Sequence, residues 1–232
     1  MSDGPAVSRP AVGWHGKLPA LGDFTTRGLD DNFVEVWDGW MSSGLSRMRA
    51  DSPDDWIAAY LSSATWRFIV TPRFLPAPLS VGMWTGVVMP SVDRVGRYYP
   101  LTLAGRLNGI PRGQDGQNAL WSWLQRLQDA AIDALQDDWS VAALDKELLR
   151  LGLPPQGGAG EDGAAVSESV SDQPANGAAP HSMAAFFSAC HSACEPTLAQ
   201  GQCIWVTENE DYEPRLLQSD RLDDSISRLW SD

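Results

Sequence analysis

The chain has 232 residues, 43% of them hydrophobic, so it can bury the core of one large domain or two small ones. Its formal net charge of −13 argues against binding to nucleic acid or to anionic membrane surfaces, because both require clustered Lys and Arg. The sequence has no apolar run of about eighteen residues and no basic segment followed by an apolar one. We therefore expect no membrane insertion, no export signal and a cytoplasmic location.

The first third of the chain predicts a strand, a loop and two helices. Residues 1–11 contain two prolines and are expected to form a flexible leader, followed by a short strand at 14–18 and a loop at 21–28. Apolar residues then recur at helical spacing over 32–49, and Asp30 or Asp31 can cap that helix. The sequence Ser-Pro-Asp-Asp at 52–55 predicts the start of a second helix, which ends near Ser62.

The middle of the chain predicts strands followed by helices. Strands are predicted at 66–70 (WRFIV), at 82–89 (GMWTGVVM) and at 100–107, where Leu101 and Leu103 alternate as in a half-buried strand, and their closeness in sequence favours antiparallel pairing. Helical periodicity follows at 120–135 and 141–149. The eleven tryptophans are scattered along the chain, so most are expected to anchor the core or an interface.

Residues 152–180 are rich in Gly, Ala, Ser, Pro and acidic residues, a composition that predicts a disordered insertion. Beyond this segment, a helix is expected near 182–189 and strands at 203–207 and 215–218. We therefore predict one α/β (α+β) domain, formed by residues 12–151 and 181–232, in which a central antiparallel sheet is flanked by α-helices.

Three cysteines, Cys190, Cys194 and Cys203, lie near the C-terminal end of the chain. Their odd number suits reduced thiols better than a disulfide framework. On a helix, Cys190 and Cys194 would share a face, but His191 would point elsewhere, and the usual two-residue spacing of zinc ligands is missing. We expect packed free cysteines, no metal site and no cofactor.

No phosphate-binding loop, dinucleotide fingerprint or hydrolase elbow occurs in the sequence. The charged residues that stand out lie in two loops, and the candidates are Lys17, Asp23, Arg27, Asp93, Arg94 and Arg97. One hypothesis is a structural cluster in which a carboxylate accepts backbone N–H groups and an arginine pairs with it. The other is a cluster that binds a metal or a phosphorylated group. The scarcity of converging carboxylates and histidines favours the structural interpretation.

Four separated motifs, GKLPALGDFTTRGL, FVEVWDGW, TWRF and GVVMPSVDRVGRYYPL, occur in order within residues 13–107. Together they resemble the TagF (ImpM) family of type VI secretion-associated proteins. The resemblance implies a single domain with a central antiparallel sheet, similar to longin-like or SRX-type folds. It brings no established catalytic residues. Some relatives carry a fused phosphatase domain, but this chain shows no second domain, so we expect no such activity.

The resemblance also implies a cytoplasmic accessory protein that represses assembly or firing of the secretion apparatus after translation. The partner that it implies is a forkhead-associated scaffold protein of that apparatus. We therefore expect an interaction protein, whose six candidate residues connect two loops or contact the partner. The alternative is a metal-dependent hydrolase that acts on phosphate esters through Asp23, Asp93 and Arg97.

Overall fold

The computed structural model describes residues 12–157, 180–195, 197–208, 214–222 and 226–230. The predicted leader at 1–11 and residues 158–179 of the predicted insertion lie outside these ranges. The strands are β1 (Val12–Gly16), β2 (Thr25–Arg27), β3 (Trp66–Val70), β4 (Met83–Met89), β5 (Leu101–Leu107), β6 (Cys203–Thr207) and β7 (Arg215–Ser219). The helices are α1 (Asp31–Asp51), α2 (Trp56–Ser62), α3 (Gln114–Gln136), α4 (Val141–Leu151), α5 (Pro180–Ala193) and α6 (Ile226–Leu229), with a 3-10 turn at Leu79–Val81.

Within the described part of the chain, the strands form one seven-stranded sheet with the order β2-β1-β5-β4-β3-β6-β7. Every neighbouring pair is antiparallel. Strands β6 and β7 come from the C-terminal part of the chain and extend the same sheet beyond β3. The predicted α/β domain with a central antiparallel sheet flanked by helices is therefore confirmed.

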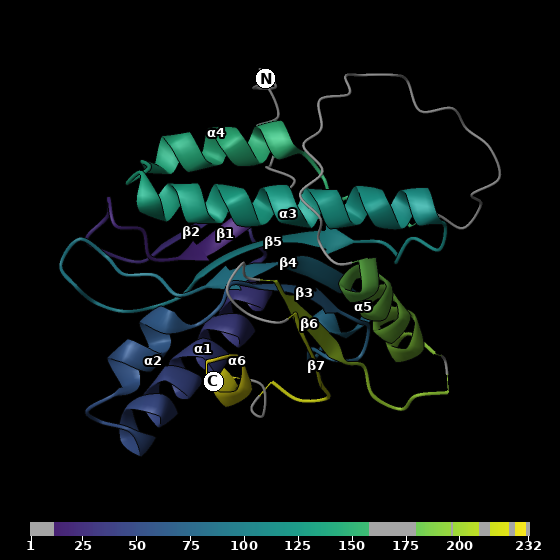
Figure 1. The fold of residues 1–232 in the computed structure, drawn as a ribbon, viewed down its shortest axis with the longest axis horizontal. Helices are drawn as coiled ribbons and strands as arrows, with labels where there is room; N and C mark the ends of the chain where they lie inside the picture. The colour runs from purple at the N-terminus through teal and green to yellow at the C-terminus, as the bar shows by residue number, and fades with distance from the viewer. Residues whose placement is uncertain (1–11, 158–179, 196, 209–213, 223–225, 231–232) are drawn as a thin grey trace, which may run out of the picture.

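Helices cover both faces of the sheet (Figure 1). Helices α3, α4 and α5 pack on one face, and α1, α2 and α6 on the other. Strand β3 is buried on both faces: Phe68 packs toward α1, whereas the next residue, Ile69, packs toward α3. A strand buried on both faces has no polar side to alternate with.

Helix α1 begins as the sequence predicted. The Asp30 carboxylate accepts a hydrogen bond from the backbone N–H of Asn32, which satisfies one of the free donors at the helix N-terminus. Buried aromatic residues then face the sheet, and the Trp37 indole Nε1–H donates to the Thr102 hydroxyl at 3.0 Å. This contact ties α1 to the middle of the sheet.

Two local predictions were wrong. Helix α2 begins at Trp56 rather than at 52 or 53, because Ser52 is the C-cap of α1, with its N–H donating to the Met48 carbonyl. Residues 53–55 form the turn between the helices. The predicted loop at 21–28 contains β2, in which Arg27 pairs with Trp14 of β1. Three residues are too few to show the alternation that identifies a strand.

The first six residues of the predicted insertion, 152–157, lie within the described range. The Gly157 N–H donates to the Gly109 carbonyl at 3.0 Å, and the Gln156 side chain accepts a hydrogen bond from the Asn108 N–H. Pro154 is buried. The chain therefore packs against the segment after β5 before it reaches residue 158.

Candidate functional site

The candidate site lies where the loop after β1 meets the loop after β4, at one end of these strands. Strands β1 and β5 are antiparallel neighbours, so the segment after β1 lies beside the segment before β5. Gly16 makes this approach possible: it has a φ of 136°, and a Cβ atom there would lie 2.1 Å from the Pro100 carbonyl oxygen. A side chain would clash at this position and strain the backbone. The glycine therefore allows Lys17 to reach the loop that follows β4.

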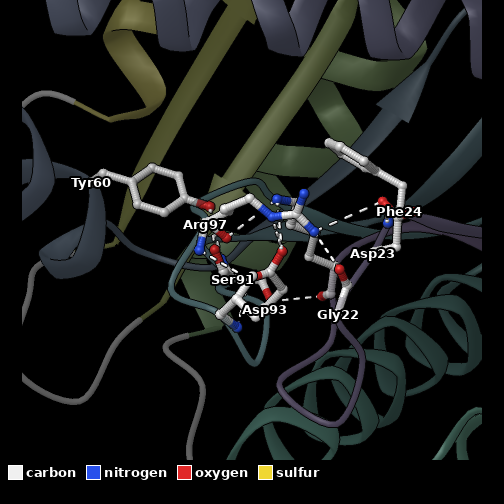
Figure 2. A network of polar contacts seen from close by, with 9 residues as sticks. Gly22, Asp23, Phe24, Tyr60, Ser91, Asp93 and Arg97 are labelled. Carbon is white, nitrogen blue, oxygen red and sulfur yellow. Dashed lines mark hydrogen bonds and ion pairs between the residues drawn. The ribbon is translucent and has the colours of Figure 1, made fainter.

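A buried carboxylate, that of Asp93, is the centre of the site (Figure 2). Its Oδ1 accepts hydrogen bonds from the backbone N–H groups of Val95 at 3.0 Å and Arg97 at 2.9 Å. Its Oδ2 accepts from Arg97 Nε at 2.7 Å and lies 3.0 Å from Lys17 Nζ. We call Lys17, Asp93 and Arg97 the Asp93 network.

The groups around Asp93 hold its carboxylate in the ionised form. Burial by itself raises the pKa of the Asp93 carboxyl, but hydrogen bonds from the Arg97 backbone, Lys17, the Arg97 side chain and the Val95 backbone outweigh it and lower the pKa. Asp93 is therefore ionised at neutral pH. Both carboxylate oxygens already have two partners, which leaves the group little capacity to bind a metal or a substrate.

The same residues hold the two loops together. The Arg97 guanidinium donates to the Gly22 carbonyl, and the backbone N–H of Arg94 donates to the Leu21 carbonyl at 2.8 Å. From the other side, the Ser91 hydroxyl donates to the Lys17 carbonyl at 2.7 Å. Hydrogen bonds from both side chains and backbone therefore connect the loop after β1 to the loop after β4.

Tyr60 supports this junction from α2. Its hydroxyl donates to the Ser91 carbonyl at 3.0 Å and accepts from the Ser91 N–H at 2.8 Å. The contact could not be predicted from the sequence, because the two residues are 31 positions apart and belong to different elements. It connects the loop junction to the helical layer that contains α1 and α2.

The structure brings three of the six candidate residues together in the Asp93 network, and the other three lie outside it. Asp23 is exposed and lies 3.9 Å from the Arg97 guanidinium. Arg94 joins the junction only through its backbone, and its side chain is exposed. Arg27 was wrongly assigned to the cluster. It lies in β2 and donates from Nε and Nη2 to Asp145 of α4, at 3.2 and 2.9 Å.

A second polar group beside the junction was missed by the sequence analysis. His15 Nδ1 lies 2.7 Å from the Thr26 hydroxyl, and Nε2 lies 3.4 Å from an oxygen of Asp38 in α1. The Tyr99 hydroxyl donates to the same oxygen at 2.5 Å. No local sequence pattern indicates this group, because its members come from two strands, a helix and a loop. Phe24 lies beside it, in edge-to-face contact with Tyr99.

The environment of His15 predicts that acid destabilises the fold. Burial lowers the pKa of His15, although the Asp38 carboxylate acts in the opposite direction. The unfolded chain therefore binds a proton at a higher pH than the folded chain, so stability is complete above about pH 6.5 and falls as the pH decreases. We expect the free energy of unfolding, measured by urea denaturation, to decrease from pH 7.5 to 5.5, with a slope of at most about 1.4 kcal/mol per pH unit for one proton. His15→Gln should flatten this dependence, and an unchanged slope would contradict the assignment.

The cysteines lie away from this site. Cys190 and Cys203 are buried, which raises the pKa of each thiol, and Cys194 is half-buried. The three are free thiols. Among the residues that the structure describes, no group of three or more His, Cys, Asp or Glu side chains is placed to hold a metal ion.

The comparisons with known proteins can be set beside this geometry. A family model described as "TagF N-terminal domain, Type VI secretion system-associated" matches residues 13–151, more than half of the chain. The chain belongs to the TagF family. The family match extends beyond the motifs at 13–107 that suggested it, through the end of α4. It makes this chain a type VI secretion-associated protein.

A solved structure resembles the whole chain. The crystal structure of PA0076 from Pseudomonas aeruginosa PAO1, at 2.05 Å resolution, has a TM-score of 0.67 and 29% sequence identity to this chain. The alignment covers 95% of this chain and 94% of that one. No curated protein matches. In the described part of the chain, none of the helices has the length and apolar character needed to cross a membrane.

Proposed function

We propose that this TagF-family protein is a cytoplasmic accessory of the type VI secretion apparatus that represses its assembly or firing after translation. It acts by stoichiometric binding to a component of the apparatus, with a forkhead-associated scaffold protein as the first candidate. The proposal rests on family membership and on the character of the candidate site. The charged residues there connect two loops, and connected loops on a rigid sheet make good docking surfaces.

The observation that carries the proposal is the saturation of Asp93. Four donors occupy its two oxygens, and its side chain has no exposed area. A hydrolase acting through this carboxylate would have to release Lys17 or Arg97 before it could bind a metal or activate water. The geometry therefore supports the interaction protein over the metal-dependent hydrolase.

Calorimetry with purified proteins tests the proposal. We expect saturable binding of the full chain to the forkhead-associated scaffold protein, with a Kd below about 50 μM and a fixed stoichiometry. Absence of binding to the scaffold and to every other purified component of the apparatus would overturn it. A parallel assay with phosphate esters and Mg²⁺ or Mn²⁺ tests the alternative. Turnover that disappears in Asp93→Asn would support the hydrolase instead.

A further inference from the structure

The polar group around His15 contains an exposed hydroxyl that lies against a buried imidazole. Thr26 is exposed on the edge strand β2, and its hydroxyl oxygen lies 2.7 Å from Nδ1 of the buried His15 ring. Nε2 of the same ring lies 3.4 Å from the Asp38 carboxylate. A hydroxyl, an imidazole and a carboxylate in this order form the arrangement that activates nucleophiles in enzymes. We propose that Thr26 is the nucleophile of an acyl-transfer site that accepts activated carboxylic esters.

The surroundings of Nε2 decide which nitrogen of the His15 ring carries the hydrogen. Burial and the neighbouring Asp38 raise the pKa of Tyr99, so its hydroxyl keeps its proton, which it donates to Asp38 Oδ1 at 2.5 Å. The Tyr99 oxygen, 3.5 Å from Nε2, and the Asp38 carboxylate are therefore both acceptors toward this nitrogen. In the neutral ring Nε2 carries the hydrogen, which leaves the lone pair of Nδ1 for the Thr26 hydroxyl.

His15 is thus placed to act as the base for Thr26. Burial lowers the pKa of His15, so the ring is neutral at neutral pH and Nδ1 can take a proton. When Nδ1 takes the proton the ring becomes a cation, and the Asp38 carboxylate beside Nε2 stabilises that charge. A threonine hydroxyl is a weak nucleophile by itself, and a positioned base typically contributes about 10²–10⁴-fold to the rate.

The reaction has two steps and needs only the ester and water. Thr26 Oγ1 attacks the carbonyl carbon of the ester while its proton passes to His15 Nδ1. The bond from that carbon to the leaving oxygen breaks, and this oxygen takes the proton from Nδ1 and departs as an alcohol or phenol. Water then attacks the acyl group on Thr26 and gives a proton to Nδ1. That proton returns to Thr26 Oγ1 as the carboxylic acid leaves.

Phe24 indicates the kind of ester. Its ring is 45% exposed and is stacked beside the His15 ring, with 6.3 Å between the centroids and an angle of 14° between the planes. The Tyr99 ring supports it from another side in edge-to-face contact, at 4.6 Å. Phe24 and the Thr26 hydroxyl therefore lie beside the same imidazole. An exposed aromatic ring next to the nucleophile favours an ester with an aromatic or other apolar group.

The release of p-nitrophenol from p-nitrophenyl acetate by the full chain tests the proposal. Thr26→Val removes the hydroxyl and keeps the branched shape. Thr25→Val is the matched control, because successive side chains of a strand project to opposite faces. We expect Thr26→Val and His15→Gln to lower the rate at least about tenfold, and Thr25→Val to change it less than about twofold. Thr26→Ser, which keeps a hydroxyl, should retain most of the activity.

Two further measurements accompany the rates. Mass spectrometry of peptides from the acid-quenched wild-type reaction should locate one acetyl group on Thr26, a result that does not depend on the stability of any variant. The wild-type rate should fall as the pH decreases and reach half of its maximum below about pH 6.5, because the protonated His15 ring cannot act as the base.

Three outcomes would overturn the inference. The first is an equal rate for wild type and Thr26→Val, with both folded by circular dichroism. The second is a rate that Thr26→Val preserves and His15→Gln abolishes, because it would make the imidazole the nucleophile. The third is acetylation confined to lysines or the N-terminus. Each of these leaves the proposed function intact, since binding to the secretion apparatus is measured separately by calorimetry.

Discussion

We expect Lys17→Met to lower the melting temperature by about 5–10 °C, because it removes the buried cation that faces Asp93. Lys17 Nζ lies 3.0 Å from the Asp93 carboxylate, and both side chains are buried. Methionine has a similar length and no charge, so the change removes the ion pair with little change in volume. The Arg97 side chain and two backbone N–H groups remain on the carboxylate, which limits the loss.

The control is Lys146→Met, which removes the other lysine of the chain from an exposed position on α4. Its melting temperature should stay within about 2 °C of wild type, as is usual for surface changes. A double variant, Lys17→Met with Asp93→Asn, should recover part of the loss, because it no longer leaves a buried charge short of a partner. Equal melting temperatures for Lys17→Met and Lys146→Met would contradict the structural role of the Asp93 network.

We expect Trp37→Ala to destabilise the protein by about 3–5 kcal/mol, the usual range for removing a large aromatic residue from a core. Trp37 is 1% exposed and lies at the centre of an aromatic cluster. Its ring centroid is 5.1 Å from Phe33, 4.8 Å from Trp40 and 4.9 Å from Phe68. The variant leaves a cavity between α1 and the sheet, and it removes the hydrogen bond to the Thr102 hydroxyl.

Equilibrium urea unfolding followed by far-UV circular dichroism measures this effect without relying on tryptophan fluorescence. Trp139→Ala is the control, because Trp139 is only partly buried at the edge of the opposite core and should cost about 1–2 kcal/mol. Trp37→Phe should fall between wild type and Trp37→Ala, since it keeps a ring and loses the indole N–H. A loss no larger than that of Trp139→Ala would show that the core does not depend on Trp37.

The Asp93 network also shows how far local sequence reasoning reaches. The sequence predicted a carboxylate that accepts backbone N–H groups and pairs with an arginine, but it placed that carboxylate in a Gly-Asp turn, whereas in the structure Asp93, which follows Val92, has this role with Arg97 as its partner. The pairing of Lys17 with Asp93 was predicted only as part of a cluster of six. The sequence could not show whether Lys17 or Arg27 pairs with Asp93, because the partner that Arg27 has in the structure, Asp145, lies 118 residues away in the chain.

The local elements were determined by the sequence itself. Periodicity in apolar residues predicts α1 and α3, and short apolar runs predict β3 to β6, because burial of one stripe or both faces of an element leaves a direct pattern in the residues. The family motifs identified the type VI secretion-associated class. These features depend on residues that are neighbours along the chain.

The tertiary structure alone decided which distant residues meet. The antiparallel pairing of β1 with β5 places Lys17 beside Asp93, and the position of β2 directs Arg27 to α4. Likewise, His15 meets Asp38 only because α1 packs over that edge of the sheet. Such contacts follow from strand order and helix packing, which are set by the free energy of burying the whole core. No short stretch of sequence contains that information.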